Sequence, residues 1–166
     1  MPSFTGPPPF GWVQKIDPQT LEVINETPQL PCGEHVWCGA IAAHQNGNII
    51  KVNGNYMHSI SSNCEVEIEK KLPIDQAHNG LLVLSDGSIV TKDLRLEGQG
   101  RSTITRLNDK LELLHEPFLL PEGSMGRIAS DKNDDGEFIY IPGIKKIWKI
   151  KVDEKLSVDR SLSLIH

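Results

Sequence analysis

The sequence lacks a basic excess and a long apolar run, and each absence excludes a class of protein. Its 166 residues have a formal net charge of −5 and a pI of about 5.7, without a basic stripe. This argues against nucleic acid and anionic membranes as main partners. The longest apolar runs, such as LLVL at 81–84, are much shorter than a membrane span. The opening MPSFTGPPPFGW has neither a basic nor an apolar signal region, so we expect a cytoplasmic location by default.

The chain also lacks the cysteine pattern of a disulfide-rich domain. It has three cysteines, Cys32, Cys38 and Cys64, which is an odd number in a chain of ordinary single-domain length. Cys32 and Cys38 are close enough in sequence to pair or to share a metal. Reduced, partly buried thiols are the simpler expectation, because that is how cysteines occur in most intracellular proteins. With 38% hydrophobic and 23% charged residues, the chain is predicted to be globular.

What the sequence does contain is an internal repeat of two paired-strand units. In the first unit, a glycine precedes a short apolar strand, a polar turn with glycine and a second strand. This unit occurs as AIAAHQNGNIIKV, LLVLSDGSIVTKD and RIASDKNDDGEFIYI. The turn glycines Gly47, Gly87 and Gly136 are 40 and 49 residues apart. Alternation of apolar and polar residues on both sides of such turns is typical of half-buried strands.

The second unit follows each copy of the first, and one more copy precedes them all. Its four copies begin at Trp12, Tyr56, Ser102 and Lys146, and three of them end in Leu-Pro. Each period of about 40–50 residues therefore holds four strands, A to D, which is the spacing of a β-propeller blade. A β-sandwich is the alternative, but it does not require this long four-strand register.

The repeat predicts an all-β fold, a fragment of a β-propeller made of four-stranded antiparallel blades. Residues 12–31 form a half blade, and 40–73, 81–121 and 127–164 form full blades, with the A strands innermost. Three and a half blades correspond to half of a six- or seven-bladed ring. An arc leaves blade faces uncovered, so we also expect self-association through these open faces.

The residues just before each A strand are the candidate ligand-binding residues, because inner strands converge on the central channel. They include His35, Trp37, His78 and Asn79, a mixture suited to a small polar ligand. The alternative is that these side chains cap strand ends or lie in water. No nucleophile motif or phosphate-binding glycine loop is present in the sequence, so no catalytic residue is predicted.

Two further features have simple structural interpretations. Trp12 and Trp148 lie in predicted C strands and are expected to pack between blades. DKNDDG at 131–136 resembles the start of a calcium loop, but Pro142 occupies the twelfth position, where such a loop has glutamate. A hairpin turn is therefore favoured over a calcium site.

One repeat resembles a known family. Asn79-Gly80, Asp86-Gly87 and Thr91-Lys92-Asp93 are similar to blades of the gluconolactonase and strictosidine synthase propellers and of NHL-type propellers. The resemblance implies a divalent metal, often calcium, in the channel, with Asn79 on a metal-contacting position. The equivalent positions of neighbouring blades have Cys38 and Met125.

The resemblance implies two alternative functions. The first is a small-molecule site at the channel mouth that binds or hydrolyses a small polar ligand, as a lactonase-like enzyme does in its full-length form. The second is a non-catalytic protein-interaction scaffold of the NHL kind. Fold alone does not decide between them.

Overall fold

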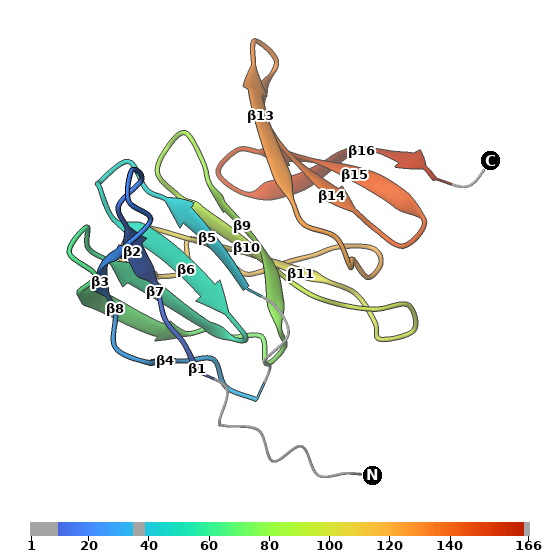
Figure 1. Cartoon of the computed structure of the whole chain (residues 1–166). Coiled ribbons are helices and arrows are strands. Elements are labelled where there is room, and N and C mark those ends of the chain that lie inside the picture. Colours follow the sequence, from blue (N-terminus) through green and yellow to red (C-terminus); the bar gives the residue numbers. More distant parts are fainter. Residues whose placement is uncertain (1–9, 35–38, 165–166) are drawn as a thin grey trace, which may run out of the picture.

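The computed structural model describes residues 10–34 and 39–164, and this part of the chain consists of strands joined by turns and loops, without a helix (Figure 1). The predicted all-β class is confirmed. The strands near the N-terminus are β1 (Phe10–Gly11), β2 (Gln14–Ile16), β3 (Val23–Glu26) and β4 (Leu30–Pro31). They form two small antiparallel pairs, β1 with β4 and β2 with β3. We call β2–β3 the N-terminal hairpin.

Three four-stranded antiparallel sheets follow, each in the simple order of the chain. The first sheet is β5 (Gly39–Ala43), β6 (Ile49–Asn53), β7 (Tyr56–Ile60) and β8 (Val66–Lys71). The second is β9 (His78–Val83), β10 (Ile89–Asp93), β11 (Thr103–Leu107) and β12 (Phe118–Leu119). The third is β13 (Ala129–Asn133), β14 (Gly136–Pro142), β15 (Lys146–Val152) and β16 (Leu156–Ser163). This is the strand order of propeller blades.

Local sequence explains the hairpins within each sheet. Gly47 and Gly87 have φ of 92° and 83° in the β5–β6 and β9–β10 turns, a backbone conformation that side chains with a Cβ disfavour. Along β6 the burial alternates, with Ile50 and Val52 fully buried and their neighbours partly exposed. This alternation is the strand period, and it directs one face of the sheet toward its neighbour.

Two apolar cores join the sheets face to face. The first and second sheets enclose Ile50, Val52, Met57, Leu72, Ile89, Leu107 and Leu111. The second and third sheets enclose Leu84, Val90, Ile104, Leu120, Ile128, Ile139, Ile141, Trp148, Ile150 and Leu156. The second sheet is therefore covered on both faces, and β10 and β11 are buried along their whole length.

The first strands of the first and second sheets lie next to each other. β5 and β9 are in contact, and β5, β9 and β13 are each an edge strand of their sheet. The N-terminal hairpin packs on the first sheet, where Lys15 Nζ donates to Ser62 O at 3.2 Å and Asn25 Nδ2 donates to Asn63 O at 2.7 Å. Figure 1 shows the third sheet inclined away from the other two, with β13 projecting from it.

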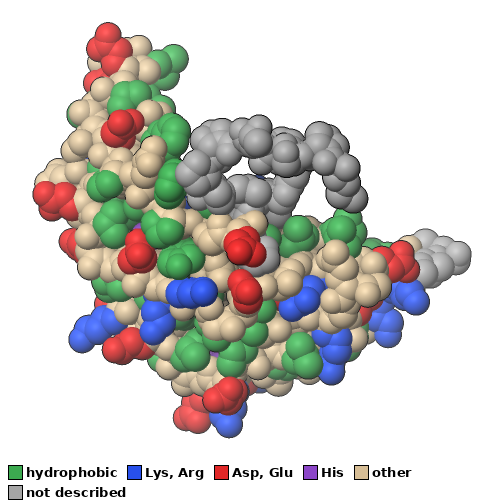
Figure 2. Space-filling model, turned by 90° about the horizontal axis from the view of Figure 1, so that it is seen from below, with side chains coloured by type: hydrophobic (Ala, Val, Ile, Leu, Met, Phe, Trp, Pro, Cys, Tyr) green, Lys and Arg blue, Asp and Glu red, His purple; other side chains and the backbone are tan. Residues whose placement is uncertain are grey.

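On the face that Figure 2 shows, acidic, basic and apolar side chains are interspersed, and no large patch of one charge is visible. Within the described residues, no helix has the length and apolar character needed to cross a bilayer.

Two of the three smaller sequence predictions are confirmed. Trp148 is 9% exposed and packs in the core between the second and third sheets, as predicted. Asp134 and Asp135 form the β13–β14 turn, where Asn133 Oδ1 accepts from Asp135 N at 2.9 Å, so the hairpin interpretation of DKNDDG is confirmed. The prediction for Trp12 was wrong: its side chain is 52% exposed, because it lies before β2 and not inside a complete blade.

Candidate functional site

His78 begins β9 at the inner edge of the second sheet, and its side chain is fully buried. Its Nδ1 lies 3.0 Å from Gly54 O and 2.8 Å from Gln76 O, two acceptors, so Nδ1 has the proton. Burial lowers the pKa of His78 below its usual value, since a charged imidazole would lose its hydration. A neutral His78 therefore ties the second sheet to the loop after β6.

Asn79 is 7% exposed and ties the second sheet to the segment before the third. Its Nδ2 donates to Met125 O at 2.6 Å and to Gly126 O at 3.3 Å. Its Oδ1 accepts from Lys92 Nζ at 2.7 Å. Both ends of the amide are thus used inside the protein, as in the strand-capping alternative.

The divalent metal implied by the resemblance does not fit the groups around Asn79. The only amide oxygen of this side chain receives an ammonium, which repels a second cation at hydrogen-bonding range. Among residues 10–34 and 39–164, no group of three or more His, Cys, Asp or Glu is placed to hold a metal ion.

The other two predicted ligand-binding residues, His35 and Trp37, lie outside the described residues. They come shortly before Gly39, the first residue of β5. That strand forms one wall of the pocket described next.

A pocket of about 560 Å³ lies between the N-terminal hairpin and the inner strands of the first sheet. Its lining comes from three parts of the chain: Trp12, Val13 and Gln14 before and in β2, Gly39, Ala40 and Ile41 of β5 with Lys51, Val52 and Asn53 of β6, and Arg127 just before β13. None of the described residues that line it is acidic. Lys51 of the first sheet and Arg127 of the loop before β13 thus place two cationic side chains in one cavity of an acidic protein.

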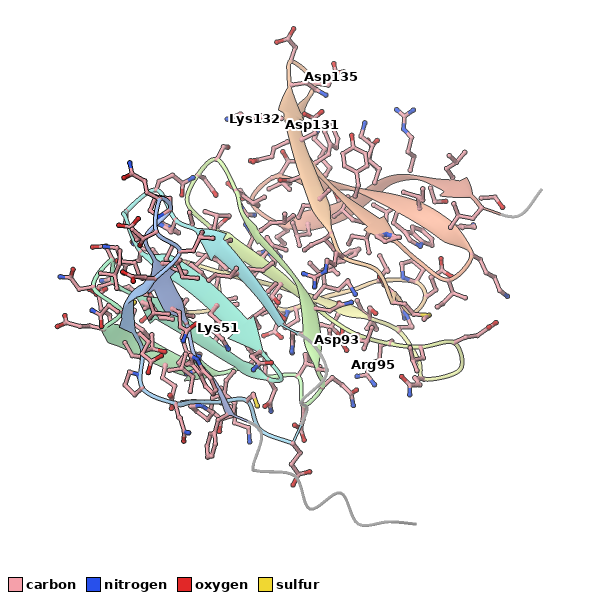
Figure 3. All side chains as sticks on the ribbon, viewed as in Figure 1. Lys51, Asp93, Arg95, Asp131, Lys132 and Asp135 are labelled. Atoms are coloured by element: carbon pink, nitrogen blue, oxygen red, sulfur yellow. The ribbon has the colours of Figure 1, made fainter. Side chains whose placement is uncertain are left out.

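Lys51 is the most distinctive of these residues, and Figure 3 shows it on the first sheet. Its Nζ is buried, and no described residue accepts a hydrogen bond from it. Burial lowers the pKa of Lys51 below its ordinary value of 10.5, an effect that nearby Cys32 opposes in part when its sulfur is ionised. Burial in turn raises the pKa of the Cys32 thiol. An ammonium with these surroundings is well placed to bind an anionic group.

Lys51 belongs to a row of side chains that crosses the first sheet. Its partners across the strands are Ile41 on β5 and His58 on β7, and His58 faces Glu69 on β8. His58 is fully buried and its Nε2 lies 2.9 Å from Glu69 Oε2. Burial lowers the pKa of His58, although the hydrogen bond to Glu69 works in the opposite direction. The row therefore places a neutral imidazole, and no acidic group, directly beside Lys51.

A second pocket, of about 570 Å³, lies at the turns of the first and second sheets. It is less suited to binding a ligand. Its polar groups already bind one another. His44 Nε2 lies 2.8 Å from Gly87 O, and Asp86 binds both Ser88 and Arg106. The His44 contact joins the first sheet to the second, and the Asp86 contacts tie the β9–β10 turn to β11 within the second sheet.

Sequence reasoning missed Lys51 and Arg127. A lysine between the apolar residues of IIKVN was a usable signal for Lys51, since a partly buried charged side chain in a short apolar strand is unusual. No pattern indicated Arg127, because its place in the pocket depends on how the first and third sheets pack around the second.

Comparisons with known proteins identify the fold. No family model matches the chain, and no curated protein gives a significant sequence match. Among solved structures, a protein of unknown function from Bacteroides caccae matches with a TM-score of 0.63 and 19% identity, over 96% of this chain and 56% of that one. Virginiamycin B lyase from Staphylococcus aureus matches with a TM-score of 0.64 and 18% identity, over 89% of this chain and 47% of that one.

A streptogramin B lyase structure matches with a TM-score of 0.61 and 21% identity, over 86% of this chain and 45% of that one. The chain thus spans about half the length of the structures that it matches. The lyase structures are β-propellers. Their likeness, together with the three stacked four-stranded sheets, shows that this chain has a β-propeller fold.

Proposed function

We propose that this chain binds a small molecule with a carboxylate or similar anionic group in the pocket lined by Lys51 and Arg127. The observation that carries the proposal is the Lys51 ammonium, which is buried beside the pocket without a hydrogen-bond acceptor among the described residues. Keeping such a group is costly for the fold, and a ligand anion supplies the missing acceptor.

The charge of the pocket supports an anion over a cation or a neutral ligand. The whole chain has a net charge of −5, yet the lining combines two cations with no acidic side chain among its described residues. Low-dielectric walls strengthen the local field of such charges and attract ligands of the opposite sign. Guanidinium and ammonium groups are also the usual protein partners of carboxylates.

The rest of the lining supports an apolar body next to the anionic group. Ile41 is 58% exposed and Trp12 is 52% exposed, so both offer uncovered apolar surface at the pocket. Aromatic rings bind flat apolar groups well, and small-ligand sites generally combine apolar walls with a few polar anchors. An aromatic or unsaturated small acid matches this lining.

The residues predicted from the sequence have two different places in this proposal. His35 and Trp37 come shortly before Gly39 in the sequence, and we propose that they contribute to ligand binding. His78 and Asn79 act instead as positioning residues, because their side chains hold the loops that lead to the pocket. We further propose a gluconolactonase-like ancestry, in which the full-length protein hydrolyses the small molecule that it binds.

A thermal-shift screen with matched pairs tests the binding proposal. Each pair is a small acid and its neutral amide, such as benzoate with benzamide and indole-3-acetate with indole-3-acetamide. The proposal expects acids to raise the melting temperature and amides to leave it unchanged at equal ionic strength. Equal shifts in melting temperature for both members of every pair would show that the pocket does not select an anionic group.

Exposed apolar side chains on the N-terminal hairpin favour a second candidate, the protein-interaction scaffold. Ile16, Leu21, Val23 and Ile24 are 49%, 76%, 50% and 57% exposed. A two-stranded sheet with such a surface is marginal by itself and gains stability by covering it. The occupant we propose is a second copy of the chain. Sedimentation velocity of the wild type and of Ile24→Lys distinguishes the two candidate functions. Only the scaffold proposal predicts a concentration-dependent dimer that Ile24→Lys abolishes.

A further inference from the structure

The junction between the second and third sheets contains a fully buried lysine ammonium. Lys92 lies on β10 and has no exposed surface. Its Nζ donates to Asn79 Oδ1 at 2.7 Å, to Ser124 O at 3.0 Å and to Asp93 O at 3.1 Å. These three acceptors are oxygen atoms of amide groups, and they come from two strands and the loop before β13.

The environment of this ammonium is that of a cation site. Amide and backbone carbonyl oxygens are common ligands of hard cations in proteins. The adjacent Asp93 carboxylate is buried as well, and it accepts from Thr103 N at 2.5 Å and from Arg95 Nε at 2.7 Å. Figure 3 shows Asp93 and Arg95 together at one end of the second sheet. The distances from Nζ are those of hydrogen bonds to an ammonium, and they exceed the 2.3–2.6 Å typical of calcium–oxygen bonds.

We propose that the Lys92 ammonium is the resident cation of this junction. It occupies the position that the family resemblance assigns to a metal contact at Asn79, and it makes the junction independent of divalent metal. The side chain is tethered, so no free ion has to be captured from solution. Removal of this ammonium leaves an oxygen-lined cavity that selects small alkylammonium ions.

The hydrogen bonds of Lys92 and Asn79 to the loop before β13 also position a residue that lines the pocket. Lys92 and Asn79 together bind the carbonyl oxygens of three successive residues, Ser124, Met125 and Gly126. Arg127 is the next residue along the chain and lines the pocket. The direction in which Arg127 leaves the loop is therefore set by the buried ammonium and the Asn79 amide.

Chemical rescue tests the proposal directly. Lys92→Ala deletes a fragment with the size and charge of n-propylammonium. This substitution should lower the melting temperature by more than about 5 °C, the scale expected for a lost buried charged contact in a domain of this size. n-Propylammonium chloride should restore at least half of the loss, whereas n-propanol, sodium chloride and calcium chloride should not. Lys149→Ala is the matched control, and n-propylammonium should leave its melting temperature unchanged.

A measurement on the wild type keeps the test valid if Lys92→Ala does not fold. The ¹H–¹⁵N spectrum of lysine ammonium groups should show one slowly exchanging signal, absent in Lys92→Arg, that neither EDTA nor calcium chloride shifts. Calorimetry with calcium chloride should detect no binding tighter than about 1 mM. Calcium binding that Asn79→Ala abolishes, or a folded Lys92→Ala that n-propylammonium does not stabilise, would overturn the proposal. Neither result bears on binding of acids at Lys51.

Discussion

Lys51 on the first sheet and Arg127 before the third line the same pocket, although the second sheet lies between these two elements in the chain. Neither cation faces an acidic side chain among the described residues of that lining. This arrangement exists only after all three sheets have stacked. It links the fold to a binding site that no single blade contains.

Lys51→Met is expected to stabilise the protein while removing its ligand binding. The substitution replaces a buried ammonium, which finds no acceptor among the described residues, by an apolar chain of similar length. We expect the free energy of unfolding in urea to rise by about 1 kcal/mol, the pattern of a residue kept for function. Lys92→Met is the matched comparison, because its ammonium has acceptors and its loss should destabilise the fold. A destabilised Lys51→Met would show that Lys51 serves the fold.

Stability is expected to fall as the pH drops below about 6.5. Burial lowers the pKa values of His58 and His78 from their ordinary value of 6.5, so both are neutral in the folded state when the unfolded chain takes up protons. The unfolded state then binds more protons, and the free energy of unfolding decreases by up to about 1.4 kcal/mol per pH unit for each histidine. This contribution is fully present above pH 6.5 and is lost below it.

Two variants that keep one N–H donor test whether His58 and His78 cause this loss of stability at low pH. His78→Asn keeps an N–H donor near the Nδ1 position, and His58→Gln keeps one near the Nε2 position that meets Glu69. Urea titrations from about pH 8 to pH 5 should show a shallower slope for each variant and the shallowest for the double variant. Parallel slopes for all four proteins would contradict the assignment.

Arg106→Met is expected to weaken the contact between the second and third sheets. The guanidinium is 5% exposed and donates to Asp86 Oδ2 at 2.9 Å, to Ser88 Oγ at 2.9 Å and to Asp153 O at 2.7 Å. Its loss removes three hydrogen bonds made by one buried guanidinium and should cost about 2–3 kcal/mol in urea unfolding. The control Arg160→Met removes a side chain that is 76% exposed, and its effect should stay within about 0.5 kcal/mol. Equal losses for the two variants would contradict the role of Arg106.

The repeat made the sheets predictable, because strand period and turn glycines are local properties. NGNIIKV and DGSIVTKD specify a turn and a strand without reference to the rest of the chain, and both form the expected hairpins. Trp12 was misplaced since its packing depends on inner strands that the N-terminal hairpin does not have.

The site was less predictable, because it depends on contacts between sheets. The position of His78 and Asn79 at the start of an inner strand follows from the repeat, but the partners of their side chains do not. Gly54, Met125 and Lys92 reach them from other strands and loops, and these contacts decide whether the polar atoms are open to a ligand.

Calorimetric titration of the wild type with a small aromatic acid and its amide tests the central claim most directly. Near neutral pH, we expect the acid to bind at least about tenfold more tightly than the amide, a difference of about 1.4 kcal/mol. Lys51→Met and Arg127→Met should each abolish this difference, while Lys149→Met should preserve it. Equal affinities for acid and amide in the wild type, or an acid preference that persists in both pocket variants, would contradict an anion site between Lys51 and Arg127.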